Sequence, residues 1–207
     1  MSLVLARRRL LAAASFVVPL AGCSVLPASH AAQIYRLNPP TDDPPNRPVL
    51  HQRLVVDIPT ASESLDTDRI ALTRNRTRFD YYADSLWTDR VPLLLQGLLV
   101  EAFQNDGTIA GVNASTLTPD YVLATEIRDF QASYEAASQD RPAAVVTLAL
   151  GLVRMPDRRL VGQTVMTESS PATRNSLDSV VEAFDVAVAK ILVRSVTWTT
   201  HLMSARK

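Results

Sequence analysis

After residue 30, hydrophobic and polar positions first form short runs of β-forming residues that are bounded by prolines. They predict strands at 33–37, 54–58, 69–73 and 78–82. Five prolines between residues 39 and 48 lack the backbone N–H that a ladder requires, so they predict an extended loop after the first strand. Asn75 and Arg76 connect the last two runs as a hairpin.

An apolar stripe at helical spacing follows and predicts the first helix. Either Ser85 or Thr88 is positioned to cap its start, and Pro92 fits only in the first turn. Gly107 is free to take the left-handed conformation that ends a helix. The residues that share the buried face are Val91, Leu95, Leu98, Ala102 and Phe103.

The second half of the chain predicts long strands. In the run 121–134, Phe130 is out of phase with the alternation that precedes it, which predicts a bulge. Residues 143–153 alternate most clearly, and 160–167 return as their antiparallel partner after a turn at 156–159.

The last predicted element is a long helix. It begins near Ser176, or at Ser179 if that serine forms a capping box with Glu182. Apolar residues then recur at spacings of four and three as far as Leu202, with a polar break at Ser195. Because such a face must be covered, the order of elements predicts an α+β fold, a mainly antiparallel sheet with two long helices packed on one face.

The beginning of the chain has the composition of a secretory signal peptide. Three arginines at 7–9 precede an apolar run at 10–20, which is shorter than the roughly 20 residues of a transmembrane helix. The next residues, Ala21-Gly22-Cys23, resemble the lipobox of bacterial lipoproteins. The resemblance implies cleavage before Cys23, a diacylglyceryl group on its thiol and an acyl chain such as palmitate on the new amino terminus. The alternative is an ordinary secreted protein.

Cysteine usage agrees with the lipobox. Cys23 is the only cysteine, so no intramolecular disulfide can form, and acylation accounts for the unpaired thiol. The expected divisions are a signal peptide at 1–22, a lipidated tether at 23–33 and a single domain at 34–207. Ser24 stands where Asp typically signals retention in the inner membrane, so we expect the periplasmic face of the outer membrane.

Composition and motifs give little indication of a catalytic, metal-binding or nucleotide-binding site. Once the leader is removed, acidic residues outnumber basic ones, which argues against nucleic-acid binding. His30, His51 and His201 are isolated, and no phosphate loop or nucleophile elbow occurs, so no metal, cofactor or enzyme activity is expected. Asp66 and Asp68 form either an acid–base pair or a solvated edge beside a turn.

The aromatic residues leave two interpretations open. Phe79, Tyr81, Tyr82 and Trp87 either line an apolar groove for acyl chains or a partner, or join strand to helix in the core. Trp198 likewise belongs to the core, or it contacts another subunit or the membrane interface.

The order of several motifs resembles one family. The motifs are Tyr35-x-Leu37, Arg78-Phe-Asp-Tyr-Tyr82, Trp87 before a leucine-rich helix, Asp120-Tyr-Val-Leu-x-x-x-Ile-x-x-Phe130 and Ala183-Phe184-x-x-Ala187. Together with the lipobox, this layout resembles the ABC-type transport auxiliary lipoprotein family, which includes paraquat-inducible protein C, over residues 33–202.

The resemblance implies a non-enzymatic component of an envelope transport system. Family members accompany an ABC ATPase, a permease and a mammalian-cell-entry (MCE) domain protein, and they help to move phospholipid or other lipids between the two membranes. Only Cys23 carries over as a modified residue. The last helix is also long enough for contact in a homo-oligomer. The alternatives are a different outer-membrane assembly lipoprotein, which contacts a β-barrel or cell-wall machinery, and an anchored periplasmic hydrolase.

Overall fold

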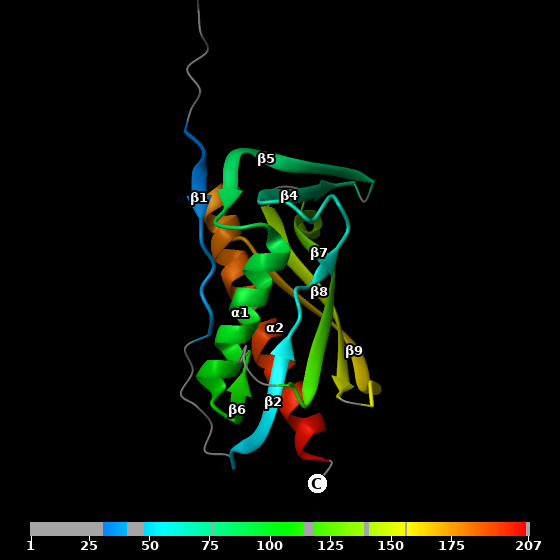
Figure 1. Ribbon diagram of the computed structural model, residues 1–207. Helices are drawn as coiled ribbons and strands as arrows, with labels where there is room; N and C mark the ends of the chain where they lie inside the picture. The colour runs from blue at the N-terminus through cyan, green and yellow to red at the C-terminus, as the bar shows by residue number, and fades with distance from the viewer. Residues whose placement is uncertain are drawn as a thin grey trace, which may run out of the picture. The chain divides into compact units, whose positions relative to one another are not determined.

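A computed structural model gives the arrangement of the elements (Figure 1). It describes residues 31–40, 48–75, 77–113, 118–138, 141–155 and 157–205. The expectations for Cys23, His30 and Arg76 lie outside these residues. The elements are β1 (Gln33–Tyr35), β2 (Leu50–Val56), β3 (Thr60–Ala61), β4 (Arg69–Arg74), β5 (Arg78–Trp87), α1 (Val91–Asp106), β6 (Ile109–Val112), β7 (Tyr121–Ser138), β8 (Arg141–Arg154), β9 (Arg159–Pro171) and α2 (Leu177–Ser204).

Long antiparallel ladders between β7, β8 and β9 form the centre of the sheet. Alternate residues of β8, including Val146 and Leu148, point toward the helices and are fully buried. The predicted bulge is confirmed, because the β7–β8 register shifts between Ile127 and Asp129. The shift returns Phe130 to the buried face, which explains why it is out of phase in the sequence.

Short strands pair along the other edge of β7. β2, β3 and β4 each run parallel to a different part of β7, while β5 pairs antiparallel with β4 and β1 pairs parallel with β5. The parallel ladders are short, so the nine-stranded mixed sheet is mostly antiparallel and the predicted α+β class is confirmed. β3 and β6 were not predicted, since they contain only two and four residues.

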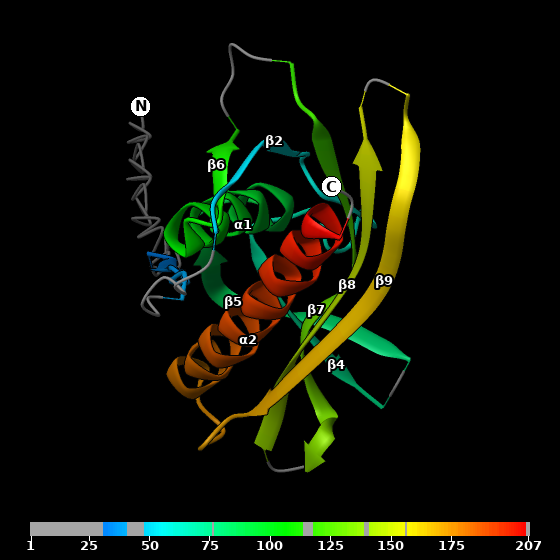
Figure 2. The same cartoon turned by 90° about the horizontal axis from the view of Figure 1, so that it is seen from below.

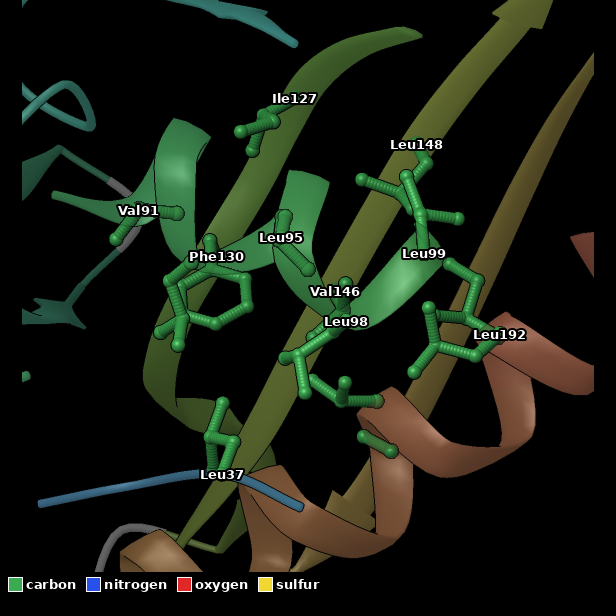
Figure 3. Close-up of a cluster of buried hydrophobic side chains, with 14 of the residues drawn as sticks. Leu37, Val91, Leu95, Leu98, Leu99, Ile127, Phe130, Val146, Leu148 and Leu192 are labelled. Atoms are coloured by element: carbon green, nitrogen blue, oxygen red, sulfur yellow. The ribbon is translucent and has the colours of Figure 1, made fainter. Parts of the chain in front are cut away.

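Both helices lie on the same side of β7, β8 and β9 (Figure 2). Every residue of the apolar stripe predicted for α1 is buried. Figure 3 shows Leu95, Leu98 and Leu99 of α1 together with Leu192 of α2 and Val146 of β8. The core therefore fills the space between the two helices and one face of the sheet.

The predicted cap of α1 was wrong. β5 continues to Trp87, so Ser85 is still in a strand, where its hydroxyl donates to the Ala83 carbonyl. Arg90 occupies the N-cap position without a side-chain hydrogen bond to the helix. Gly107 ends α1 at φ 67°, as its residue type predicts.

α2 begins at Leu177, directly after Ser176. The alternative start at Ser179 was wrong, because this residue lies inside the helix and its hydroxyl is 2.8 Å from that of Thr173. At the polar break, the Ser195 hydroxyl donates to the Ile191 carbonyl at 2.7 Å. This bond satisfies the serine within the buried face, so the helix continues without interruption.

We expect alanine substitutions at two glycines in and after α1 to change the free energy of unfolding in opposite directions. Gly97 is exposed in the helix with nothing within 4 Å of an added Cβ, so Gly97→Ala raises the free energy of unfolding by about 0.5–1 kcal/mol. Gly107 has a positive φ, so Gly107→Ala lowers it by about 1 kcal/mol. Urea denaturation of the two variants checks both values, and a change of the same sign in both contradicts the prediction.

Candidate functional site

The fold separates the aromatic residues into a buried set and an exposed set. Trp87 is only 2 % exposed, and its ring meets Phe130 at 5.8 Å and Phe184 at 5.2 Å between centroids, both edge-on. Tyr82 is also largely buried, and this burial raises the pKa of its phenol. Trp198 is half-buried on α2, with Cζ2 3.6 Å from the position of a Cβ at Gly162 on β9. These three side chains are used in packing.

The second set lies on the β4–β5 hairpin and is only partly exposed, since Tyr81 is half-buried. Phe79 is 38 % exposed, and its ring meets Tyr81 edge-on at 5.5 Å. The Arg69 guanidinium lies 3.9 Å from the centroid of the Tyr81 ring, and the Tyr81 hydroxyl donates to the Ser64 carbonyl at 2.9 Å. We call Arg69, Phe79 and Tyr81 the hairpin cluster.

A bulge in β5 causes this separation. Asp84 has φ 51°, and the β4–β5 register shifts between the pairs Arg69–Leu86 and Ala71–Tyr81. Strict alternation would place Tyr81 and Trp87 on the same face. The extra residues of the bulge turn Trp87 toward the helices and leave Tyr81 on the outer face.

Two arginine–aspartate pairs joined by hydrogen bonds connect residues at the ends of strands. Arg53 on β2 donates through its guanidinium to both carboxylate oxygens of Asp120, at 3.0 and 3.1 Å, and through its backbone N–H at 2.8 Å. These bonds hold the pKa of Asp120 below its ordinary value. Arg154 similarly lowers the pKa of Asp157 in the β8–β9 turn. Both pairs fasten strand ends.

The two aspartates proposed as an acid–base pair have different partners. Asp66 forms an ion pair with Arg90, just before α1. The carboxylate of Asp68 lies 3.5 Å from the Thr67 hydroxyl, and its backbone carbonyl accepts from Trp87. Within the described ranges, no cluster of three His, Cys, Asp or Glu side chains could hold a metal ion.

The two remaining histidines lie on different elements. His51 is exposed on β2, whereas His201 lies near the end of α2 and lines a shallow hollow with Thr197 and Thr200. Neither of the two described helices is long and apolar enough to cross a membrane.

The sheet face that points away from the helices contains another hollow. It has a volume of about 480 Å³ and is floored by Ala124, Ala149 and Gly151. Gly151 pairs with Ala124 of β7 and Gln163 of β9, and Ala149 pairs with Glu126 and Val165. Small side chains on β8 thus leave a trough between larger neighbours. We call it the outer-face hollow.

The rim of the outer-face hollow is partly charged and partly apolar. Glu126 and Arg128 form an ion pair at 3.3 Å on one side, and Val165 is 51 % exposed on the other. Sequence reasoning did not find this hollow. Its signal is the small residue at alternate positions of β8, which is visible only once the outward face is known.

Comparison with known protein families shows which family the chain belongs to. Residues 35–194 match the model of the ABC-type transport auxiliary lipoprotein component. The chain belongs to this family. The resemblance inferred from the short motifs is therefore confirmed.

Individual relatives agree with this placement. An uncharacterized protein of Bradyrhizobium diazoefficiens is 28% identical over 170 residues, which cover 80% of this chain and 44% of the relative. The chain thus spans less than half the length of that relative. Protein XCC0632 from Xanthomonas campestris is 26% identical, with a TM-score of 0.77 over 84% of this chain and 98% of its own. The hypothetical protein CT253 from Chlamydia trachomatis, 8% identical, shares the fold with a TM-score of 0.51 over 76% of this chain and 100% of its own.

Proposed function

We propose that this protein is the non-enzymatic periplasmic lipoprotein of an MCE-type ABC system that moves lipids between the inner and outer membranes. The family match over residues 35–194 carries the proposal. The geometry supports it, because the described groups with shifted pKa values hold the fold together. Asp120 and Asp157 each pair with an arginine, and the Tyr35 hydroxyl on β1 donates to Asp178 on α2 at 3.0 Å. A reaction centre instead collects such groups in one cleft.

Acylation of Cys23 holds the protein in the envelope in this proposal. A diacylglyceryl group on the thiol and an acyl chain on the amino group together give firm membrane attachment, whereas one chain alone binds marginally. Ser24 after the cysteine supports residence on the periplasmic face of the outer membrane.

The outer-face hollow is the surface that we assign to the transport partner. The helices and the core use the opposite face of the sheet, so the small side chains of Ala124, Ala149 and Gly151 are available for contact. An apolar floor with a partly charged rim is typical of a protein-binding surface. The partner that we expect there is the MCE-domain protein, which connects this lipoprotein to the permease and the ATPase.

Affinity purification of the tagged protein from its own bacterium tests this function. Under mild crosslinking, we expect the MCE-domain protein and the ABC permease to co-purify. Ala149→Arg places a long charged side chain on the floor of the hollow and reduces their recovery at least several-fold. Val186→Arg, at an exposed position of α2, is the matched control and leaves recovery unchanged. Recovery of β-barrel or cell-wall proteins in place of the transporter contradicts the proposal.

A further inference from the structure

The length of the proposed tether limits where the domain can stand relative to the membrane. Nine residues lie between Cys23 and Gln33, the first residue of β1, and a fully extended chain covers at most about 35 Å from one to the other. This limit rests on the acylation of Cys23 proposed above. The beginning of β1 must therefore remain within about 35 Å of the bilayer surface.

The β4–β5 hairpin lies at the same end of the domain. Ile34 of β1 pairs with Leu86 of β5, so the two strands are adjacent. Figure 1 shows β1, β4 and β5 at one end of the fold and the C-terminal end of α2 at the other. The tether therefore allows the end of the domain that carries the hairpin to reach the membrane surface.

Exposed apolar side chains and arginines lie on the strands at this end. Phe79 is 38 % exposed beside Tyr81, and Ile34 on the neighbouring strand is 68 % exposed. Arg69 lies over the Tyr81 ring. Aromatic rings are enriched at the headgroup level of membranes, and arginines bind the phosphates found there.

The charge of this end is concentrated in the hairpin. Arg78 forms an ion pair with Asp80 at 2.7 Å, whereas the Arg74 guanidinium lies 4.4 Å from the centroid of the Tyr134 ring. The adjacent loop is acidic, although one of its carboxylates, that of Asp66, is paired with Arg90. Attraction for anionic lipid thus comes from the arginines of β4 and β5.

We propose that the β4–β5 hairpin contacts the bilayer that holds the lipid anchor. The Phe79 ring enters the headgroup region, and Arg69 and Arg74 bind the phosphates of anionic phospholipid. The contact orients the domain on its tether, so that the outer-face hollow is presented in a fixed direction.

A single fluorescent label tests this contact in the full acylated chain. Cys23 is the only cysteine, so once it is acylated a cysteine introduced at Thr77, in the hairpin turn, is the only free thiol. An environment-sensitive label there becomes several-fold brighter and shifts to the blue in vesicles of phosphatidylcholine with phosphatidylglycerol, compared with detergent. The control is Arg158→Cys in the β8–β9 turn, which is also rich in arginine but lies at the opposite end, and its label does not change.

Two further measurements separate this contact from the anchor itself. Phe79→Ser combined with Arg74→Gln abolishes the signal at position 77, while the protein still floats with the vesicles. An unchanged label at position 77 in a protein that floats with the vesicles overturns the hairpin contact and leaves the anchor intact. If the chain without introduced cysteines still reacts with the thiol label, Cys23 is not acylated. That result overturns the anchor and, with it, the hairpin contact.

Discussion

Trp87→Ala lowers the free energy of unfolding by about 3–5 kcal/mol, because it empties the centre of the core. The indole is buried against two phenylalanine rings from different elements, Phe130 of β7 and Phe184 of α2. Its removal leaves a cavity that neither ring can fill, since each is fixed by its own neighbours. Urea denaturation monitored by circular dichroism measures the change.

Two controls establish that the loss comes from buried contact. Trp87→Phe keeps an aromatic ring and removes an indole N–H that has no hydrogen-bond partner, so its loss is smaller. Phe79→Ala removes a ring that is 38 % exposed, and we expect a change of about 1 kcal/mol or less. If Trp87→Ala costs no more than Phe79→Ala, the assignment of Trp87 to the core is wrong.

Cys23→Ala moves the protein from the membrane pellet to the soluble periplasmic fraction. The physical reason is that each buried CH₂ of an acyl chain contributes about 0.8 kcal/mol to membrane binding, and the variant carries no such chain. Cell fractionation with immunoblotting measures the distribution. Mass spectrometry of the intact protein confirms that the leader has been removed.

A neighbouring substitution serves as the control for the anchor. Ser24→Ala leaves the acylated cysteine in place, so this variant stays in the outer-membrane fraction. If leader-free Cys23→Ala still fractionates with the outer membrane, the anchor hypothesis is wrong. Such a result would show that the folded domain binds the membrane by itself.

The long elements could be predicted from the sequence because each repeats its own signal many times. The alternation of β8 and the apolar stripe of α1 cover several turns or residue pairs, so a local exception does not hide them. Phe130 shows that even an irregularity is visible when regular alternation surrounds it. In contrast, β3 has only two residues and no period of its own. Its pairing with β7 depends on tertiary contact alone.

The surfaces were harder to predict for a physical reason. Tyr81 and Trp87 look alike in the sequence, and a positive φ at Asp84 decides which of them faces the core. The outer-face hollow also depends on three strands aligned side by side, so no single segment contains its signal. The family resemblance was accessible because short packing motifs are read in order along the chain, without knowledge of the faces.

The strand β7 fixes the distance between the β4–β5 hairpin and the outer-face hollow. The hairpin strand β4 joins β7 at Ala132, and the outer-face hollow lies at Ala124, eight residues away on the same strand. At about 3.3 Å per residue, this separation is about 25 Å. β7 is hydrogen-bonded to β8 on both sides of the bulge after Ile127, and this pairing fixes the separation. In the proposed arrangement, this separation would hold the outer-face hollow at a constant distance from the hairpin that contacts the lipid headgroups, whereas the tether alone would let that distance vary.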